Sequence, residues 1–140
     1  MRTTTGTSTN GSGKGGGAAS VSAHSADFSA TADCQDRTVA ATLTGTADLT
    51  AKKALDEFLS RLHETARAQG VAEVVVDFKS LAFMNSSCLK GFVTWICAVQ
   101  ELPPQTQYRI VLVSSREMLW QQRSLHALSC LATDLVTLQS

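Results

Sequence analysis

The chain has 140 residues, 44% of them hydrophobic, and its 12 basic side chains balance its 12 acidic ones. This length suits one domain with a substantial hydrophobic core. Because the formal charges cancel, there is no electrostatic reason to expect nucleic acid or an anionic membrane as a partner. The sequence has no apolar run that could cross a bilayer and no signal peptide, so we expect a cytoplasmic protein.

The cysteines and the glycine-rich run give no sign of a bound metal or cofactor. The four cysteines are scattered without a C-x-x-C pair: Cys34, Cys88, Cys97 and Cys130. Zinc needs clustered ligands, so free thiols in a reducing cytoplasm are the simpler interpretation. The run GSGKGGG at 11–17 follows no strand and lacks the G-x-x-x-x-G-K-[ST] spacing of a phosphate-binding loop. We expect neither a metal site nor a cofactor.

Residues 1–24 differ in composition from the rest of the chain. They are mostly Thr, Gly, Ser and Ala with very few large apolar groups. Such a segment cannot bury enough surface to offset the entropy lost on ordering. The sequence therefore predicts a flexible tail over 1–24 and one folded domain over 25–140.

The first part of this domain reads as a hairpin followed by a helix. Residues 28–34 and 38–45 alternate apolar or small residues with polar ones, which is typical of paired strands. Asp48 or Thr50 can then cap a helix that Gly70 ends. Its apolar stripe has helical spacing: Leu55, Phe58, Leu59, Leu62 and Ala66.

Strands and helices alternate in the remainder. We expect strands at 72–78, 108–115 and 135–138, the first of them central or covered on both faces because of its consecutive valines. A second helix ends before Pro103 and Pro104, and Ser114 with Glu117 forms a capping box for a third. The apolar face expected for the second helix is Leu89, Phe92, Val93, Ile96 and Cys97. This order predicts an α/β fold with a mixed, largely parallel sheet of four to five strands and about three helices.

Consecutive serines in the stretch FMNSSCLKGFV, residues 83–93, mark the start of the second helix. The simplest interpretation is that Asn85, Ser86 or Ser87 caps the helix. Lys90, three residues after Ser87, fits that role less well, because a cation opposes the helix dipole at this end. The same lysine becomes favourable if a phosphate is attached to either serine.

A catalytic role for these residues has less support. Ser87 with His63 or His126 and Asp77 supplies the residue types of a hydrolase triad, but the G-x-S-x-G elbow is missing. His63 falls on the charged side of its helix, so we expect it to be exposed. Cys88 is a possible nucleophile at a helix start, without an adjacent base. We therefore expect no catalytic residues.

The central segment resembles a known family. EVVVDFKSLAFMNSSCLKGFV, residues 73–93, is similar without gaps to the core of STAS domains, the family of bacterial anti-sigma factor antagonists. The family pattern is an apolar strand, a short loop, and then Phe-Met-Asp-Ser-Ser-Gly-Leu-Gly. Upstream, LTGTADLTA resembles the family's L-x-G-x-x-D-x-x-x-A, with Gly45 and Asp48 in register. The departures are Asn85, Cys88 and Lys90, which replace an acidic residue and two glycines.

The resemblance implies a STAS-like fold and partner switching in transcription regulation. Unphosphorylated members bind a kinase-type anti-sigma factor of the histidine-kinase-like ATPase type, or a related regulator; phosphorylation by that kinase breaks the complex, and a PP2C-type phosphatase restores it. By motif match the phosphorylated residue is Ser87, with Ser86 as the alternative. The implied partner contacts are Asp48, Met84, Asn85, Ser86, Ser87 and Lys90. The open alternative is an adaptor or homodimeric scaffold that is never phosphorylated.

Overall fold

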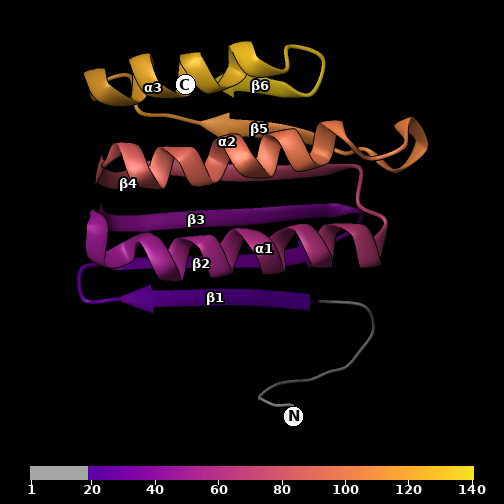
Figure 1. Ribbon diagram of the computed structural model, residues 1–140, viewed down its shortest axis with the longest axis horizontal. Helices are drawn as coiled ribbons and strands as arrows, with labels where there is room; N and C mark the ends of the chain where they lie inside the picture. The colour runs from indigo at the N-terminus through magenta and orange to yellow at the C-terminus, as the bar shows by residue number, and fades with distance from the viewer. Residues whose placement is uncertain (1–18) are drawn as a thin grey trace.

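A computed structural model describes residues 19–140, which form strands and helices in alternation (Figure 1). The strands are β1 (Ala19–Ser25), β2 (Phe28–Gln35), β3 (Thr38–Ala47), β4 (Glu73–Met84), β5 (Arg109–Val113) and β6 (Val136–Gln139). The α-helices are α1 (Lys52–Gln69), α2 (Ser86–Gln100) and α3 (Leu119–Leu131). Two short 3-10 helices, Leu49–Ala51 and Pro104–Thr106, precede α1 and β5.

All the described strands belong to one sheet, in the order β1-β2-β3-β4-β5-β6. The first three are antiparallel neighbours, and β3 to β6 are parallel. Each pair of neighbouring parallel strands is connected through one helix, and all these connections run in the same direction across the sheet. Because such crossovers are right-handed, the helices lie on the same face. Figure 1 shows α1 and α2 side by side in front of the sheet. The predicted α/β class is confirmed, with six strands in place of four to five.

The additional strand, β1, corrects the predicted domain boundary. Ala19–Ser25 pairs with β2 along its whole length, from Ala19↔Cys34 to Ser25↔Phe28. Its alanines, serines and histidine are weak strand formers, and only Val21 is buried in the core. Pairing with β2 and packing against α1 therefore order a segment whose composition alone predicts a tail. The rest of the predicted tail, residues 1–18, lies outside the described residues.

The core lies between the sheet and its helices. The predicted stripe of α1 is buried as expected. On α2 the prediction is only partly right: Phe92 and Ile96 are buried, but Cys97 is exposed. β4 is central, as its valines predicted, but it is not covered on both faces, because Val75 is only half-buried on the helix-free side.

β4 runs further than the predicted 72–78 and continues to Met84. Its pairing with β5 ends at Asp77↔Val113, whereas its pairing with β3 continues to Ala47↔Met84. Beyond the end of β5, the buried amide of Gln121 on α3 takes over: its Nε2 donates to the carbonyl oxygens of Phe78 (2.7 Å) and Leu81 (2.9 Å). One side chain thus satisfies backbone groups that have lost their strand partner.

The predicted capping box of the third helix is wrong. Ser114 is buried, and its hydroxyl donates to the carbonyl of Gln139 at 3.1 Å. The helix starts later, at Leu119, and its preceding residue Met118 makes no side-chain capping bond. Ser114 therefore stabilises the pairing of β5 with the end of β6 and does not cap the helix, as the local pattern predicted.

Gly45 lies near the C-terminal end of β3, where the register between β3 and β4 shifts. Its φ is +92°, and a Cβ at this position would lie 2.0 Å from the carbonyl oxygen of Asp27. That oxygen accepts a hydrogen bond from Thr46 N at 2.8 Å, so the contact cannot relax without breaking the hairpin. Gly70 at the end of α1 also has a positive φ, +62°, but a Cβ there meets nothing within 4 Å.

We expect Gly45→Ala to lower the free energy of unfolding by about 3 kcal/mol or more, because it combines a left-handed conformation with a backbone clash. Gly70→Ala is the matched control, with an expected loss of about 1 kcal/mol from conformation alone. Urea unfolding of the two variants measures the difference. Equal losses would show that the close approach to Asp27 has no energetic weight.

Candidate functional site

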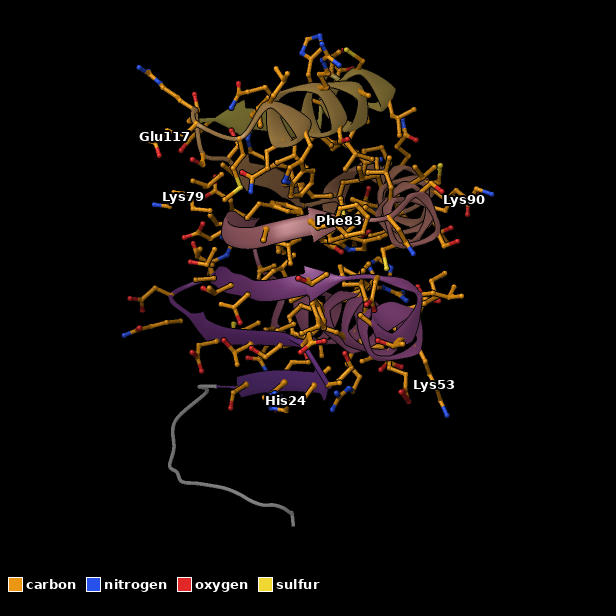
Figure 2. All side chains as sticks on the ribbon, turned by 90° about the vertical axis from the view of Figure 1, so that its left-hand side faces the viewer. His24, Lys53, Lys79, Phe83, Lys90 and Glu117 are labelled. Carbon is orange, nitrogen blue, oxygen red and sulfur yellow. The ribbon has the colours of Figure 1, made fainter. Side chains whose placement is uncertain are left out.

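The serine pair lies where the parallel strands end. In Figure 2 this edge faces the viewer, with Phe83 near its centre and Lys90 on the helix side. The last residues of β3 and β4 are paired, Ala47 with Met84, and Asn85 N then donates to the carbonyl of Ala47 at 2.9 Å. The chain therefore enters α2 from a fixed point at the carboxyl edge of the sheet, where open α/β sheets commonly place their sites.

Asn85 is the residue that caps α2. Its Oδ1 accepts a hydrogen bond from the backbone N–H of Cys88 at 2.9 Å. Ser86 and Ser87 form the first turn, and within residues 19–140 neither hydroxyl has a hydrogen-bond partner. The capping role that the sequence allowed for all of these residues thus falls to Asn85, and both serine hydroxyls are left free.

The two serines differ in accessibility. Ser86 is exposed and Ser87 is half-buried. Both lie at the end of α2 where unpaired N–H groups give a partial positive charge. The edge therefore presents accessible hydroxyls at a position that favours a negative group.

Asp48 belongs to the same edge. Its Oδ1 accepts hydrogen bonds from the hydroxyl of Thr50 at 2.6 Å and from Thr50 N at 3.0 Å. The bond from the Thr50 hydroxyl, more than any other cause, lowers the pKa of Asp48, so this carboxylate stays charged. Its backbone carbonyl accepts a hydrogen bond from Cys88 Sγ at 3.5 Å, which connects the loop before α1 to the first turn of α2.

The structure brings the predicted contact residues together. Met84 is half-buried against the core, and Asn85, Ser86 and Ser87 follow it directly. Lys90 is exposed one helical turn beyond the serines. We call this group, with Asp48, the serine edge.

Sequence reasoning missed two apolar side chains at the serine edge. Leu49 is 71% exposed and Phe83 is 48% exposed. Leu49 follows Asp48 directly, and Phe83 precedes Met84 at the end of β4. Apolar surface with a polar rim is typical of protein–protein interfaces, so these two side chains make the serine edge a candidate for one. For Leu49 the available signal was an apolar residue in the first turn after the capping Asp48, where acidic side chains are favoured.

The residue types of a triad are not assembled around Ser87. His63 is half-buried, not exposed as predicted, and its Nδ1 lies 2.6 Å from the Tyr108 hydroxyl. Asp77 accepts a hydrogen bond from Lys79 N. His126 is on α3, with its Nε2 3.6 Å from Cys130 Sγ.

Cys88 is fully buried, and burial raises the pKa of its thiol, which opposes formation of a nucleophilic thiolate. In the part of the chain that the structure describes, no three His, Cys, Asp or Glu side chains are grouped as a metal ion would require. No helix in this part combines the length and the apolar character needed to span a bilayer.

We expect Asn85→Ala to lower the free energy of unfolding by about 1 kcal/mol, because the N–H of Cys88 loses its cap. Ser86→Ala is the control, with an expected change within about 0.5 kcal/mol, since the Ser86 hydroxyl makes no hydrogen bond within residues 19–140. Thermal or urea unfolding measures both. A larger loss for the serine variant would mean that Ser86 contributes to the cap.

Comparisons with known proteins support the fold. No protein-family model and no curated protein sequence matches the chain. Its structure is similar to the crystal structure of an anti-sigma factor antagonist from Mycobacterium paratuberculosis, with a TM-score of 0.59 and 16% identity over 80% of this chain and 85% of that chain. The anti-sigma factor antagonist SpoIIAA in its unphosphorylated form gives a TM-score of 0.49 and 20% identity over 78% of this chain and 86% of that chain. The chain has the fold of an anti-sigma factor antagonist, the STAS-like fold that its central motif predicts.

Proposed function

We propose that the chain is a partner-switching regulator of bacterial transcription that acts in the cytoplasm. Its unphosphorylated form binds an anti-sigma factor that is also a serine kinase of the histidine-kinase-like ATPase type, or a related regulator. That kinase phosphorylates Ser87, or alternatively Ser86, and the complex dissociates. A PP2C-type phosphatase restores the binding form. The role is one of binding, without catalysis by this chain.

The observation that carries this proposal is the state of the serine hydroxyls. They are accessible, they have no partner within the described residues, and they stand at the positive end of a helix that Asn85 already caps. A kinase can modify such a hydroxyl without disrupting the fold, because no internal hydrogen bond is lost. The helix end then stabilises the phosphate.

The same edge explains why a phosphate would weaken binding. Leu49 and Phe83 offer apolar surface that a partner would cover, and a phosphoserine beside them carries close to two negative charges that would have to be desolvated. A partner that covers this edge would also exclude water from the phosphate and the charged Asp48 carboxylate, which strengthens the repulsion between them. A loss of about 1.4 kcal/mol already weakens binding tenfold. Lys90 offsets part of the new charge, so the modified domain itself stays stable.

Two properties point to different serines. Ser87 occupies the position that the motif assigns to the phosphorylated residue, whereas Ser86 is the more exposed hydroxyl. Single alanine variants distinguish them, because only the loss of the true acceptor abolishes phosphorylation.

We expect one phosphate on the wild-type chain after incubation with its cognate kinase and ATP, detected by mass spectrometry, and none on Ser86→Ala/Ser87→Ala. The aspartate variant of the acceptor should bind the partner at least about tenfold more weakly, because it places a charge in the interface. Ser20→Asp on β1, also an exposed serine, is the control and should bind normally. Equal binding of the alanine and aspartate variants, with no phosphopeptide, would favour the unphosphorylated adaptor or homodimeric scaffold.

We also expect Leu49→Ala and Phe83→Ala each to weaken partner binding about tenfold, as removal of an apolar anchor does. Leu49→Ala should change the unfolding free energy by no more than about 0.5 kcal/mol, because Leu49 is 71% exposed. Phe83→Ala should lower it by about 1 to 2 kcal/mol, because about half of that side chain is covered. Leu131→Ala is the matched control, since Leu131 is 46% exposed and is the last residue of α3, outside the serine edge. Unchanged affinity in both test variants would place the interface away from the serine edge.

A further inference from the structure

A groove runs along the helix side of the molecule between α1 and α2. Its volume is about 320 Å³, at the lower end of the range of small-molecule sites. Small residues keep it open: Ser60 on α1, and Gly91 and Ala98 on α2. Two buried apolar side chains, Leu59 and Trp95, line its inner part.

One end of the groove has an uncompensated positive charge. Lys52 is paired with Asp56 on the same helix, so their charges cancel. Lys90 also lines the groove, is exposed, and has no ion-pair partner among residues 19–140. A ligand with a negative group would find its counter-charge at Lys90.

The other end has a hydrogen-bond donor that the interior holds in place. Tyr108 is buried, and its hydroxyl oxygen accepts a hydrogen bond from Trp95 Nε1 at 2.8 Å. The hydroxyl hydrogen is then available for His63 Nδ1, 2.6 Å away. In that arrangement the hydrogen of the neutral ring is on Nε2, which has no partner among the described residues.

The charges around His63 agree with a neutral ring. Burial, and then the nearby Arg67, lower the pKa of His63, against a smaller opposing effect of Glu64. At neutral pH the ring is therefore an uncharged N–H donor on the wall of the groove.

The two ends are separated by a distance that suits a small flat molecule. An added Cβ on Gly91 would lie 2.8 Å from Asp56 Oδ1, so the neighbouring Lys90 is near the level of Asp56. His63 is two turns further along α1, about 10 Å at 1.5 Å per residue. Leu59 and Trp95 provide apolar surface between these levels.

We propose that the groove between α1 and α2 binds a small organic anion with a flat apolar body, whose negative group pairs with Lys90 and whose far end accepts a hydrogen bond from His63 Nε2. The site does not depend on the proposed partner switching. It shares Lys90 with the serine edge but otherwise uses the sides of α1 and α2, whereas the rest of the serine edge is the loop before α1 and the first turn of α2.

The test titrates the purified full chain with three matched probes by calorimetry. Para-hydroxycinnamate has a carboxylate and a hydroxyl at opposite ends of a flat body, cinnamate lacks the hydroxyl, and cinnamyl alcohol also lacks the charge. We expect one site per chain, with affinity falling about fivefold from the first probe to the second and about tenfold from the second to the third. No binding at millimolar concentration, or equal affinities for the three probes, would overturn the proposal.

Variants locate the site. Thr94→Phe, at an exposed position that lines the groove, should abolish binding by filling it. Lys90→Gln should weaken both carboxylates about tenfold and leave cinnamyl alcohol unchanged. Lys53→Gln, an exposed lysine of α1 outside the groove, is the control and should change nothing. Unaltered binding in Thr94→Phe would place the probes elsewhere and contradict the assignment.

His63→Phe should remove the advantage of para-hydroxycinnamate over cinnamate. If loss of the bond to Tyr108 prevents this variant from folding, the comparison of the two probes on the wild-type chain still tests the donor. None of these titrations contains a partner protein. The groove proposal can therefore fail while partner switching holds, and partner switching can fail while the groove still binds the probes.

Discussion

The serine edge depends on β4 remaining paired with β3 after β5 has ended. Parallel pairing with β5 stops at Val113, yet β4 continues to Met84 with β3 on one side and the amide of Gln121 on the other. The hydrogen bond from Asn85 N to the carbonyl of Ala47 then fixes the point where the chain turns into α2. The serine pair is therefore presented by the end of a strand and not by a loose loop. A partner that binds there need not order a flexible segment, and so avoids an entropic cost of binding.

At this fixed point, the structural role and the proposed functional role fall to different neighbouring residues. Asn85 satisfies the helix end, and buried Cys88 connects it to the loop of Asp48. Ser86 and Ser87 are left with no structural task within the described residues, although they stand in the first turn of a helix. A hydroxyl that stabilises nothing can gain a phosphate without loss of stability. The departure from the family pattern at Asn85 fits this division, since an amide caps the helix and adds no negative charge beside the serines.

The sequence predicted what local spacing controls and missed what distant contacts control. The stripe of α1, its end at Gly70 and the position of the serine pair follow from periodicity and capping residues. β1 and the role of Ser114 do not, because pairing with β2 and the backbone of β6 outweighs weak local preference. The exposure of Phe83 at the serine edge also could not be predicted from the sequence. β3 and β4 shift register between Thr42 and Thr46, so simple alternation along β4 does not carry through to Phe83.

Lys90 connects the serine edge with the groove. It lies one turn beyond Ser87 and also lines the space between α1 and α2. A lysine ammonium close to two anions cannot pair fully with both. If a phosphate is attached to the serine edge, it draws Lys90 toward the first turn of α2 and weakens the hold on an anion in the groove. By linkage, an anion in the groove weakens the pairing of Lys90 with that phosphate to the same extent. The two proposals thus imply that a phosphate on the serine edge and an anion in the groove compete for the same lysine.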